Sequence, residues 1–524
     1  MTQADHLFDA IVIGGGHNGL VSAAYLAKAG KRVLLLEAST HLGGALTTAE
    51  ISPDYRVSTA AHLVDAVPRH IERDLKLAKH GLRYAVKKMP TIALDHDLNH
   101  IVLSTGRADL DILRRHSAND VTAYLAHVAR MKSYSKLLGP LFYDQLPASG
   151  PEPLARRLRR LVWGAERLGS DTLENLMRQL PGSIGDMLDD TFETPLLKGA
   201  LALDAVLGTA DGPYAAGTAL NAMSRHALRS QSKGPHVIVG GLGAFADALA
   251  ASAANFGVVI KAATDVKRIL VSDGTVRGIQ TGHGDIYEAP LVLSSLHPRE
   301  TLLDMVGAKY LDAGLVKQLS GIVDTGATAK LNLSLDGLPT IQGLGPHEYN
   351  ARFLVAPSLV GLDDAFTAFK HGEFSSDMPM EFTIPSVADA PLAPAGQHVM
   401  SIVMQYVPYA INGTWESHRD RLVDRVIETL SGYMPDLRDR IVAGELMLPP
   451  DIERKFGLAN GGWYHGDLRL DQLLAFRPAP SLARYATSIK GLFLCGSGCH
   501  PAGGICGLPG EYAARAALKE GGRA

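Results

Sequence analysis

A glycine-rich turn between two apolar strands constrains the fold of this chain more than any other feature. Residues 10–13 read AIVI, a short apolar run rich in β-branched residues, which predicts a buried strand. A G-x-G-x-x-G pattern follows at Gly14, Gly16 and Gly19, and then a helical pattern begins. A second apolar strand at residues 32–36 completes a strand–turn–helix–strand unit, which predicts an α/β fold.

The glycines, together with the acid that follows the second strand, predict a dinucleotide site. The first glycine permits the tight turn, the second lets backbone approach a pyrophosphate, and the third lets helix pack close to strand. The helix N-terminus offers unpaired N–H groups and a positive dipole end to the phosphates. Glu37 can accept hydrogen bonds from both ribose hydroxyls of an adenosine, and its charge disfavours a 2′-phosphate. An ordinary βαβ crossover would not explain why glycines and acid fall in register.

Composition excludes several other classes of protein. A chain of 524 residues is too long for one usual core, so we expect two interleaved or consecutive domains. A net charge of −3 argues against nucleic acid as a partner. Three cysteines without a C-x-x-C pair argue against a disulfide framework and favour a reducing compartment. Because neither a signal peptide nor an 18-residue apolar run is found, we expect a cytoplasmic protein without a membrane span.

A further pair of glycines points to a flavin. Gly43 and Gly44 lie six residues beyond Glu37, where backbone must again come close to another group. This spacing resembles the extended nucleotide-binding motif of the glutathione-reductase-like FAD superfamily, in the branch that holds amine oxidases and phytoene desaturases. It therefore favours FAD over a nicotinamide cofactor. A simple glycine-rich turn is the alternative interpretation.

A second glycine-rich pattern lies in the middle of the chain. Gly241, Gly243 and Ala246 fit G-x-G-x-x-A between two apolar runs, which would suit a nicotinamide and thus an NAD(P)H-using reductase. The second run leads to Lys261, however, and no acid is present there to hold a ribose. In resembling flavoproteins this segment is a helix and hairpin of the FAD domain, and the next strand, here at Val266, binds adenine through backbone atoms.

The C-terminal segment repeats the strand, glycine-rich loop and helix pattern of the first turn. Residues 491–495 predict a buried strand, residues 496–504 a glycine-rich loop, and a helix follows from about Gly507. A helix N-terminus in this place would stabilise negative charge building at flavin N1 and C2=O. We therefore expect the two ends of the chain to build one site.

Three stretches together resemble the phytoene-desaturase-like flavoproteins: GHNGLVSAAYLAKAG, GGWYHGDLRLDQLLAFRP at 461–478, and LFLCGSGCHPAGGICG. Within them, the chain is most similar to the group of pyridine nucleotide-disulphide oxidoreductase domain-containing protein 2. The resemblance implies an α/β fold, with a glutathione-reductase-like FAD-binding Rossmann domain interleaved with a mixed α+β substrate domain. Gly496-Ser497 departs from the Gly-Asp of many amine oxidases, which weakens a strict amine-oxidase assignment.

These patterns predict domain segments and cofactor contacts. The FAD-binding domain is assigned residues 1–105, 235–305 and 485–524, and the substrate domain residues 106–234, mainly helical, and 306–484. The predicted FAD contacts are Gly14, Gly15, Gly16, His17, Asn18, Gly19, Glu37, Ala38, Gly43, Gly44, Ala45, Val266, Gly496, Ser497, Ile505 and Cys506.

The resemblance implies an FAD-dependent oxidoreductase of the dehydrogenase or desaturase type. In this reading, a hydride passes from an apolar or amphipathic small molecule to flavin N5. The sequence leaves the electron acceptor open, with oxygen and a quinone as candidates. An amine or imine oxidase is one alternative, and a flavoprotein whose main role is to bind a partner protein is another. His62, His465 and His500 are the candidates for proton handling, although His62 equally suits a hydrogen-bonded core histidine.

Three other signals carry less weight. His96 and His100 lie one helical turn apart, but turn-forming residues separate them and no third metal ligand is near, so we expect no metal. Residues 154–168 form a basic amphipathic pattern that suits either peripheral contact with an anionic membrane or a solvated helix face. Cys499 or Cys506 would suit a covalent flavin, but a small buried hydrophobic side chain is the simpler role for each.

Overall fold

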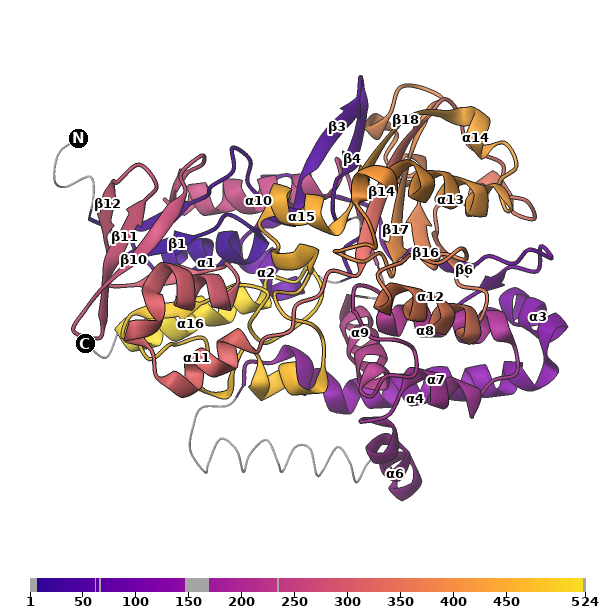
Figure 1. The fold of residues 1–524 in the computed structure, drawn as a ribbon, viewed down its shortest axis with the longest axis horizontal. Helices are drawn as coiled ribbons and strands as arrows, with labels where there is room; N and C mark the ends of the chain where they lie inside the picture. Colours follow the sequence, from indigo (N-terminus) through magenta and orange to yellow (C-terminus); the bar gives the residue numbers. More distant parts are fainter. Residues whose placement is uncertain (1–6, 62, 66, 147–168, 233–234, 522–524) are drawn as a thin grey trace.

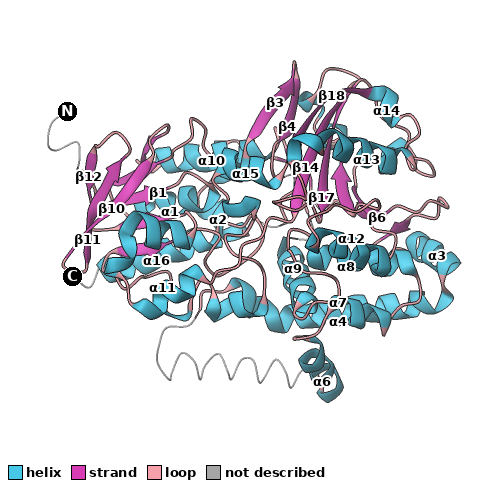
Figure 2. Ribbon diagram, in the orientation of Figure 1, coloured by secondary structure: helices cyan, strands magenta, loops and turns pink. Residues whose placement is uncertain are grey.

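The computed structural model describes residues 7–61, 63–65, 67–146, 169–232 and 235–521. Two sheets lie at opposite ends of an elongated molecule, and helices fill the space beside and beneath them (Figures 1 and 2). No helix in the described part of the chain is long and apolar enough to cross a membrane. The basic stretch at 154–168 lies outside the described residues.

The first sheet has five parallel strands in the order β19-β13-β1-β2-β9. Its strands are β1 (Ala10–Ile13), β2 (Val33–Leu36), β9 (Val259–Lys261), β13 (Val292–Ser294) and β19 (Leu492–Leu494). Most of their residues are buried, as expected of a parallel sheet covered by helices. The strands come from three distant segments of the chain. The predicted α/β class and its Rossmann-like sheet are therefore confirmed.

Three helices cover this parallel sheet: α1 (His17–Lys28), α10 (Leu242–Asn255) and α16 (Leu508–Gly521). Helix α1 packs between the other two. At Gly510 an added Cβ would lie 2.2 Å from the carbonyl oxygen of Asn18, so α16 approaches α1 more closely than any side chain would allow. The Ser22 hydroxyl donates to the Gly510 carbonyl across this contact (2.8 Å). The two ends of the chain are thus locked together.

The second sheet is mixed, with seven strands in the order β18-β14-β17-β16-β15-β6-β7. Its strands are β6 (Thr91–Ala93), β7 (Ile101–Val102), β14 (Thr328–Leu335), β15 (Arg352–Val355), β16 (Met380–Thr383), β17 (His398–Gln405) and β18 (Ile441–Met447). All neighbours are antiparallel except β15 and β6. A separate core forms on it, in which Phe353 and Phe382 stack at 4.8 Å.

The boundary predicted at residue 105 differs from the observed sheets. Strands β6 and β7 lie inside the segment 1–105 that we assigned to the FAD-binding domain, yet both pair at the edge of the seven-stranded sheet. Strand β6 reads Thr-Ile-Ala and β7 only Ile-Val, so nothing in their residues indicates which sheet they join. Strand β6 pairs with the distant β15, and β7 joins the sheet only through β6, so one long-range pairing places both strands.

A layer of helices lies below the second sheet (Figure 1). It consists of α3 (Arg107–His116), α4 (Ala118–Tyr143), α6 (Ser170–Gln179), α7 (Ile184–Asp189), α8 (Pro195–Val206) and α9 (Thr218–Ser232). Ser117 caps α4 by accepting from the Asp120 N–H, and Ser183 caps α7 in the same way. Helix α9 packs on both α4 and α8. In the described part of residues 106–234, these helices agree with the mainly helical character that the sequence predicts.

Short elements complete the fold. The predicted hairpin layer is the three-stranded sheet β10 (Val266–Ser272), β11 (Thr275–Thr281) and β12 (Ile286–Glu288). Two small antiparallel pairs join β3 (Thr48–Ser52) with β4 (Tyr55–Ser58) and β5 (Tyr84–Val86) with β8 (Val237–Ile238). The remaining helices are α2 (Arg69–Asp74), α11 (Ala313–Ser320), α12 (Leu359–Lys370), α13 (Arg419–Ser431), α14 (Leu437–Arg440) and α15 (Pro449–Phe456).

Candidate functional site

A cavity of about 940 Å³ joins the two halves of the molecule. One side is lined by the β1–α1 turn, the end of β2, residues 43–47 and the C-terminal loop. The other side is lined by α9, by strands β15, β16 and β17 of the second sheet, and by residues 463–468. Because both parts of the fold contribute to its wall, the cavity can hold a cofactor and a second small molecule together.

The β1–α1 turn is shaped by close backbone packing. Gly14 has a φ of +92°, and the Ser295 hydroxyl donates to the Gly14 carbonyl beside it (3.2 Å). At Gly19 an added Cβ would lie 2.0 Å from the Gly14 carbonyl oxygen, so only glycine lets α1 rest on the turn. At Gly16, by contrast, an added Cβ would meet no atom within 4 Å. Gly16 is thus the glycine that faces open space.

The N-terminus of α1 opens toward the cavity. Gly16 is the N-cap residue, and no side chain among the described residues caps the helix. His17 and Asn18, in the first turn, both line the cavity. The Oδ1 atom of Asn18 is buried and has no hydrogen-bond partner. Uncapped N–H groups at a helix N-terminus form an anion site, so this turn fits the pyrophosphate of a dinucleotide.

Glu37 lies at the end of β2, beside the same turn. Its Oε2 accepts from the Gly15 N–H (2.6 Å) and its Oε1 from the Ser39 N–H (2.8 Å). These bonds hold the carboxylate in the wall of the cavity. The side chain is positioned where the sequence predicts a ribose acceptor, and Val266 at the start of β10 lines the cavity nearby.

Residues 43–45 form the next part of the wall. Gly43 has a φ of +110° and donates its N–H to the Gly15 carbonyl (2.9 Å), which joins this turn to the first one. At Gly43 an added Cβ would lie 2.7 Å from the Cβ of Ala246 on α10. The glycine is therefore required by the packing of α10, and the adjoining Gly44 and Ala45 line the cavity.

The C-terminal loop closes the cavity from the far end of the chain. The Asn18 side-chain amide donates to the Ser497 hydroxyl (3.3 Å), a contact between residues 479 positions apart. Gly503 and Gly504, with φ of +80° and +77°, and Ile505 line the cavity before α16 begins. Residues from both ends of the chain therefore line the same cavity.

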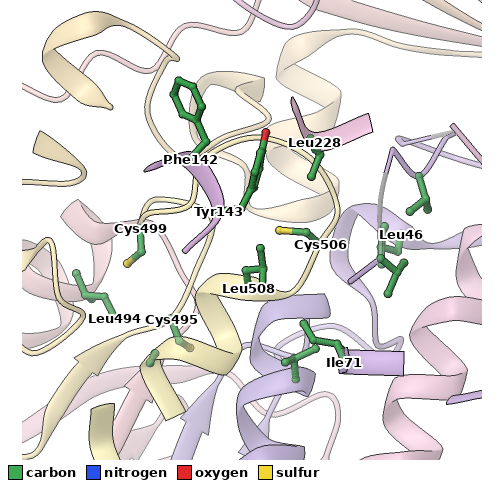
Figure 3. Close-up of a cluster of buried hydrophobic side chains, with 14 of the residues drawn as sticks. Leu46, Ile71, Phe142, Tyr143, Leu228, Leu494, Cys495, Cys499, Cys506 and Leu508 are labelled. Atoms are coloured by element: carbon green, nitrogen blue, oxygen red, sulfur yellow. The ribbon is translucent and has the colours of Figure 1, made fainter. Parts of the chain in front are cut away.

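The three cysteines lie in the core behind this loop. Figure 3 shows Cys495, Cys499 and Cys506 among apolar side chains that include Leu508 and Tyr143. All three are free and buried, and burial raises the pKa of the Cys506 thiol to about 11. None of them lines the cavity. They act as small hydrophobic side chains in this structure.

The three histidines predicted as candidates for proton handling lie in different places. His465 lines the cavity, with a φ of +55° and an Nδ1 atom that is buried without a hydrogen-bond partner. Burial, with the nearby charge of His297, lowers the pKa of His465 to about 3, so the ring is neutral. His500 is buried outside the cavity wall, where its Nε2 contacts the Asp144 carbonyl (3.1 Å). His62 lies outside the described residues.

Of the predicted cofactor contacts, most belong to the cavity wall. These are Gly14, Gly16, His17, Asn18, Glu37, Ala38, Gly43, Gly44, Ala45, Val266, Ser497 and Ile505. Gly15, Gly19, Gly496 and Cys506 are not in the wall and support it from behind. Gly496 leaves room for the backbone of Ser295, since an added Cβ would lie 2.2 Å from that carbonyl oxygen.

The second glycine-rich turn, between β8 and α10, is closed by side chains. The Gly240 N–H donates to Asp389 (2.5 Å), the Leu242 N–H to Ser58 (2.9 Å), and the Gly243 N–H to Thr48 (2.8 Å). At Gly241 an added Cβ would lie 2.6 Å from the Thr48 hydroxyl. The donors that a pyrophosphate would need are already used, so this helix start fits no second dinucleotide.

No motif in the sequence predicts the network of ion pairs in and behind the cavity wall. Arg229 on α9 bonds Asp65 (2.8 Å) and Asp204 (2.6 Å), and Arg352 on β15 bonds Asp204 (2.6 Å). Although burial raises the pKa of Asp204, the two guanidinium groups hold it well below its ordinary value. Arg352 also pairs with Glu381. The one available signal was the spacing of polar residues along 218–232, which places them on a single helix face.

No cluster of His, Cys, Asp and Glu suited to a metal ion is found among the residues that the structure describes. His100 instead holds backbone, since its Nδ1 accepts from the Asp95 N–H (2.9 Å) and its Nε2 contacts the Gln342 carbonyl (2.7 Å). His96 stacks on Tyr433. Each histidine is thus occupied by a structural contact.

The parallel Rossmann-like sheet, joined to a second sheet around one cavity, is an architecture shared with an oxidoreductase of known structure. Residues 12–76 match the NAD(P)-binding Rossmann-like domain. A putrescine oxidase structure superposes with a TM-score of 0.62 at 12% identity, covering 98% of both chains. This likeness shows the shared fold.

Sequence comparison places the chain more narrowly. It is 32% identical to pyridine nucleotide-disulfide oxidoreductase domain-containing protein 2 of Mus musculus, over 98% of this chain and 94% of the mouse protein. It is 25% identical to the neurosporene-forming phytoene desaturase of Cereibacter sphaeroides, over 58% of each chain. The chain belongs to the family of pyridine nucleotide-disulfide oxidoreductase domain-containing protein 2, as its motifs predict.

Proposed function

We propose that this chain is an FAD-dependent oxidoreductase of the dehydrogenase or desaturase type, which passes a hydride from an apolar or amphipathic small molecule to flavin N5. The observation that carries the proposal is the cavity, which joins the uncapped N-terminus of α1 to a wall where apolar side chains such as Val403 lie beside the charged Arg352 and Glu381. A flavin supplies the hydride acceptor when bound, and the protein supplies position and the exclusion of water.

The residues fit FAD from one end of the cavity. The α1 N-terminus would hold the pyrophosphate, Glu37 the ribose, and the strand at Val266 the adenine. The C-terminal loop with Gly503, Gly504 and Ile505 would face the isoalloxazine. The orphaned Oδ1 of Asn18 supports this fit, because a buried acceptor without a partner is costly unless a ligand satisfies it.

The part of the cavity that the second sheet and residues 463–473 line combines apolar side chains with charged ones, which suits an apolar or amphipathic molecule. Leu207, Val403, Trp463, Leu468 and Leu473 line it. The phytoene desaturase relative is named for a reaction on an apolar compound, which agrees with this lining. Water held off by such side chains would otherwise compete for the reacting carbon.

Of His465 and His500, the two described histidines that were predicted to handle protons, His465 lines the cavity. It lines the cavity as a neutral imidazole whose Nδ1 has no protein partner, and its pKa of about 3 keeps it neutral across the physiological range. At this pKa the ring is a weak base, so we assign it a hydrogen bond that orients a substrate atom. The His465→Asn variant, which tolerates the left-handed backbone, should lower the rate of flavin reduction without lowering FAD occupancy.

The test is anaerobic flavin reduction by purified protein. We expect the chain to carry FAD and its yellow colour to bleach with a polyene or lipid extract and not with a panel of amines. Bleaching by amines alone would establish the amine or imine oxidase instead. FAD that dithionite reduces but no compound in either panel does would favour a flavoprotein that serves to bind a partner.

A further inference from the structure

One face of α9 forms a polar strip in the wall of the cavity, next to apolar side chains such as Leu207 and Trp463. Asn221, Ser224, Arg225, Leu228 and Arg229 all line the cavity. Their spacing of three, four, seven and eight residues puts them on one side of the helix. Two guanidinium groups therefore stand in the wall where the second molecule is expected, beside side chains that suit a hydrocarbon.

The two arginines on this face differ in their partners. Arg229 is matched by Asp65 and Asp204 on either side. Arg225 donates instead to two neutral oxygens, the Leu207 carbonyl (2.9 Å) and the Tyr464 hydroxyl (3.1 Å). Within the described chain, no carboxylate forms an ion pair with Arg225. Its side chain is only partly buried and borders the cavity, so a ligand can reach it.

Arg352 is a second, independent indication that the cavity wall has a hydrogen-bond donor without an acceptor. Its side chain is 1% exposed, and it borders the cavity from β15. One of its terminal nitrogens, Nη2, bonds Asp204, and Nε bonds Glu381. The other, Nη1, is buried with no hydrogen-bond partner. A buried charged donor left without an acceptor is costly, and an anionic ligand would remove that cost.

Tyr464 completes the arrangement beside Arg225. Its hydroxyl oxygen accepts from the Arg225 guanidinium, so its own hydrogen can be donated to a ligand. Burial raises the pKa of Tyr464, so the hydroxyl stays protonated. Guanidinium and phenol are a pair of donors suited to a planar group that bears two oxygens.

We propose that this end of the cavity binds the carboxylate of an amphipathic carboxylic acid, held by Arg225 and Tyr464, with the hydrocarbon tail along the apolar wall. That the acid is the substrate rests on the proposed function; that it binds does not. An amine would place a second cation against Arg225. A neutral hydrocarbon would leave the Arg225 guanidinium without an anionic partner. A carboxylate satisfies the donors and leaves the tail against leucine and tryptophan side chains.

Isothermal titration calorimetry of the purified full chain with decanoate, decanol and decylamine tests the proposal. These probes share one tail and differ only in their head group. We expect decanoate to bind at least tenfold more tightly than decanol, and decylamine to bind more weakly than either. The Arg225→Gln variant should lose this preference, while Arg225→Lys, which keeps the charge without the planar fork, should keep part of it.

Two controls make the outcome decisive. Binding of decanol by Arg225→Gln at the wild-type affinity shows that the variant folds and that its cavity is intact. Lys455→Gln removes a different cation from the cavity wall, one paired with Glu445 (3.2 Å), and should leave the preference for decanoate unchanged. Equal affinity for decanoate and decanol, a preference that survives Arg225→Gln, or a preference lost in Lys455→Gln would each overturn the proposal.

The readout also separates this inference from the proposed function. If decanoate binds as expected but no compound reduces the flavin, the carboxylate site stands and the oxidoreductase proposal fails. If apolar compounds without an acidic group reduce the flavin and decanoate shows no preference, the reverse holds.

Discussion

Two glycine-rich turns in this molecule have nearly the same sequence pattern, yet the backbone N–H groups of one are open to a cavity and those of the other are bonded to side chains. At the β1–α1 turn the helix N-terminus is uncapped and faces a large cavity, with Glu37 beside it. At the β8–α10 turn, three backbone N–H groups are taken by Asp389, Ser58 and Thr48. A G-x-G-x-x-G-like pattern therefore specifies how tightly strand, turn and helix pack, and its surroundings decide whether a ligand can enter.

Replacing a glycine by valine in each turn should give the largest difference between the two turns, measured as the loss in the free energy of unfolding. Gly241→Val places a Cβ 2.6 Å from the Thr48 hydroxyl on a backbone with a φ of +77°, so we expect a loss of about 2–5 kcal/mol in the free energy of unfolding. Gly16→Val meets no protein atom on an extended backbone, so its loss should be about 1 kcal/mol. Urea unfolding measures both. Similar losses at the two positions would abolish the distinction.

Removing the acid of the first turn should weaken the cofactor. Glu37→Ala loses the charged acceptor that we assign to the ribose, so the affinity for FAD should fall about 10–100-fold. Fluorescence titration of flavin-free protein with FAD gives the dissociation constant. An unchanged constant would show that Glu37 serves only the Gly15 and Ser39 N–H groups that it now accepts from.

Removing the acid of the second turn should do the reverse. Asp389→Ala leaves the Gly240 N–H without its acceptor, so we expect a loss of about 1–3 kcal/mol in stability. FAD affinity should be unaffected, because Asp389 is not in the cavity wall. Thermal unfolding in the presence of saturating FAD, together with the same titration, checks both statements. A large loss of FAD affinity would mean that the turns are coupled.

The smallest expected effect is that of a nicotinamide. Because the donors of the β8–α10 turn are used by side chains, NADPH should neither bind there nor bleach the flavin rapidly under anaerobic conditions. Stopped-flow absorbance measures the rate. Rapid bleaching that disappears in Gly241→Val would show a working second nucleotide site and contradict the closed turn.

Local features of the fold were predictable from the residues. Short glycine patterns in the sequence predict three of these features: the β1–α1–β2 unit, the turn at Gly43-Gly44 and the C-terminal loop. They do so because glycine spacing reflects the local conformation of the backbone. The fold class and the meeting of the chain ends follow from them. Strands β6 and β7 carry no such signal, and their place in the second sheet depends on the pairing of β6 with β15, far along the chain.

The site was predictable in the same uneven way. Glu37 and the turn glycines are marked by spacing, and most of the residues expected to contact FAD border the cavity. The closure of the second turn depends on Thr48, Ser58 and Asp389, which lie on other elements and belong to no motif. The charges around Arg225 and Arg352 likewise meet only through tertiary packing, so their role is read from contacts and not from spacing.

The most direct test of the central claim, that the β1–α1 turn and the C-terminal loop build an FAD site, is the FAD content of wild-type and Gly16→Val protein. Gly16 borders the cavity and a Cβ there touches no protein atom, so the variant should fold normally while its side chain occupies the place of the pyrophosphate. We predict one FAD per chain for the wild type and none for Gly16→Val, with closely similar circular dichroism. Full FAD occupancy in a folded Gly16→Val protein would contradict the account.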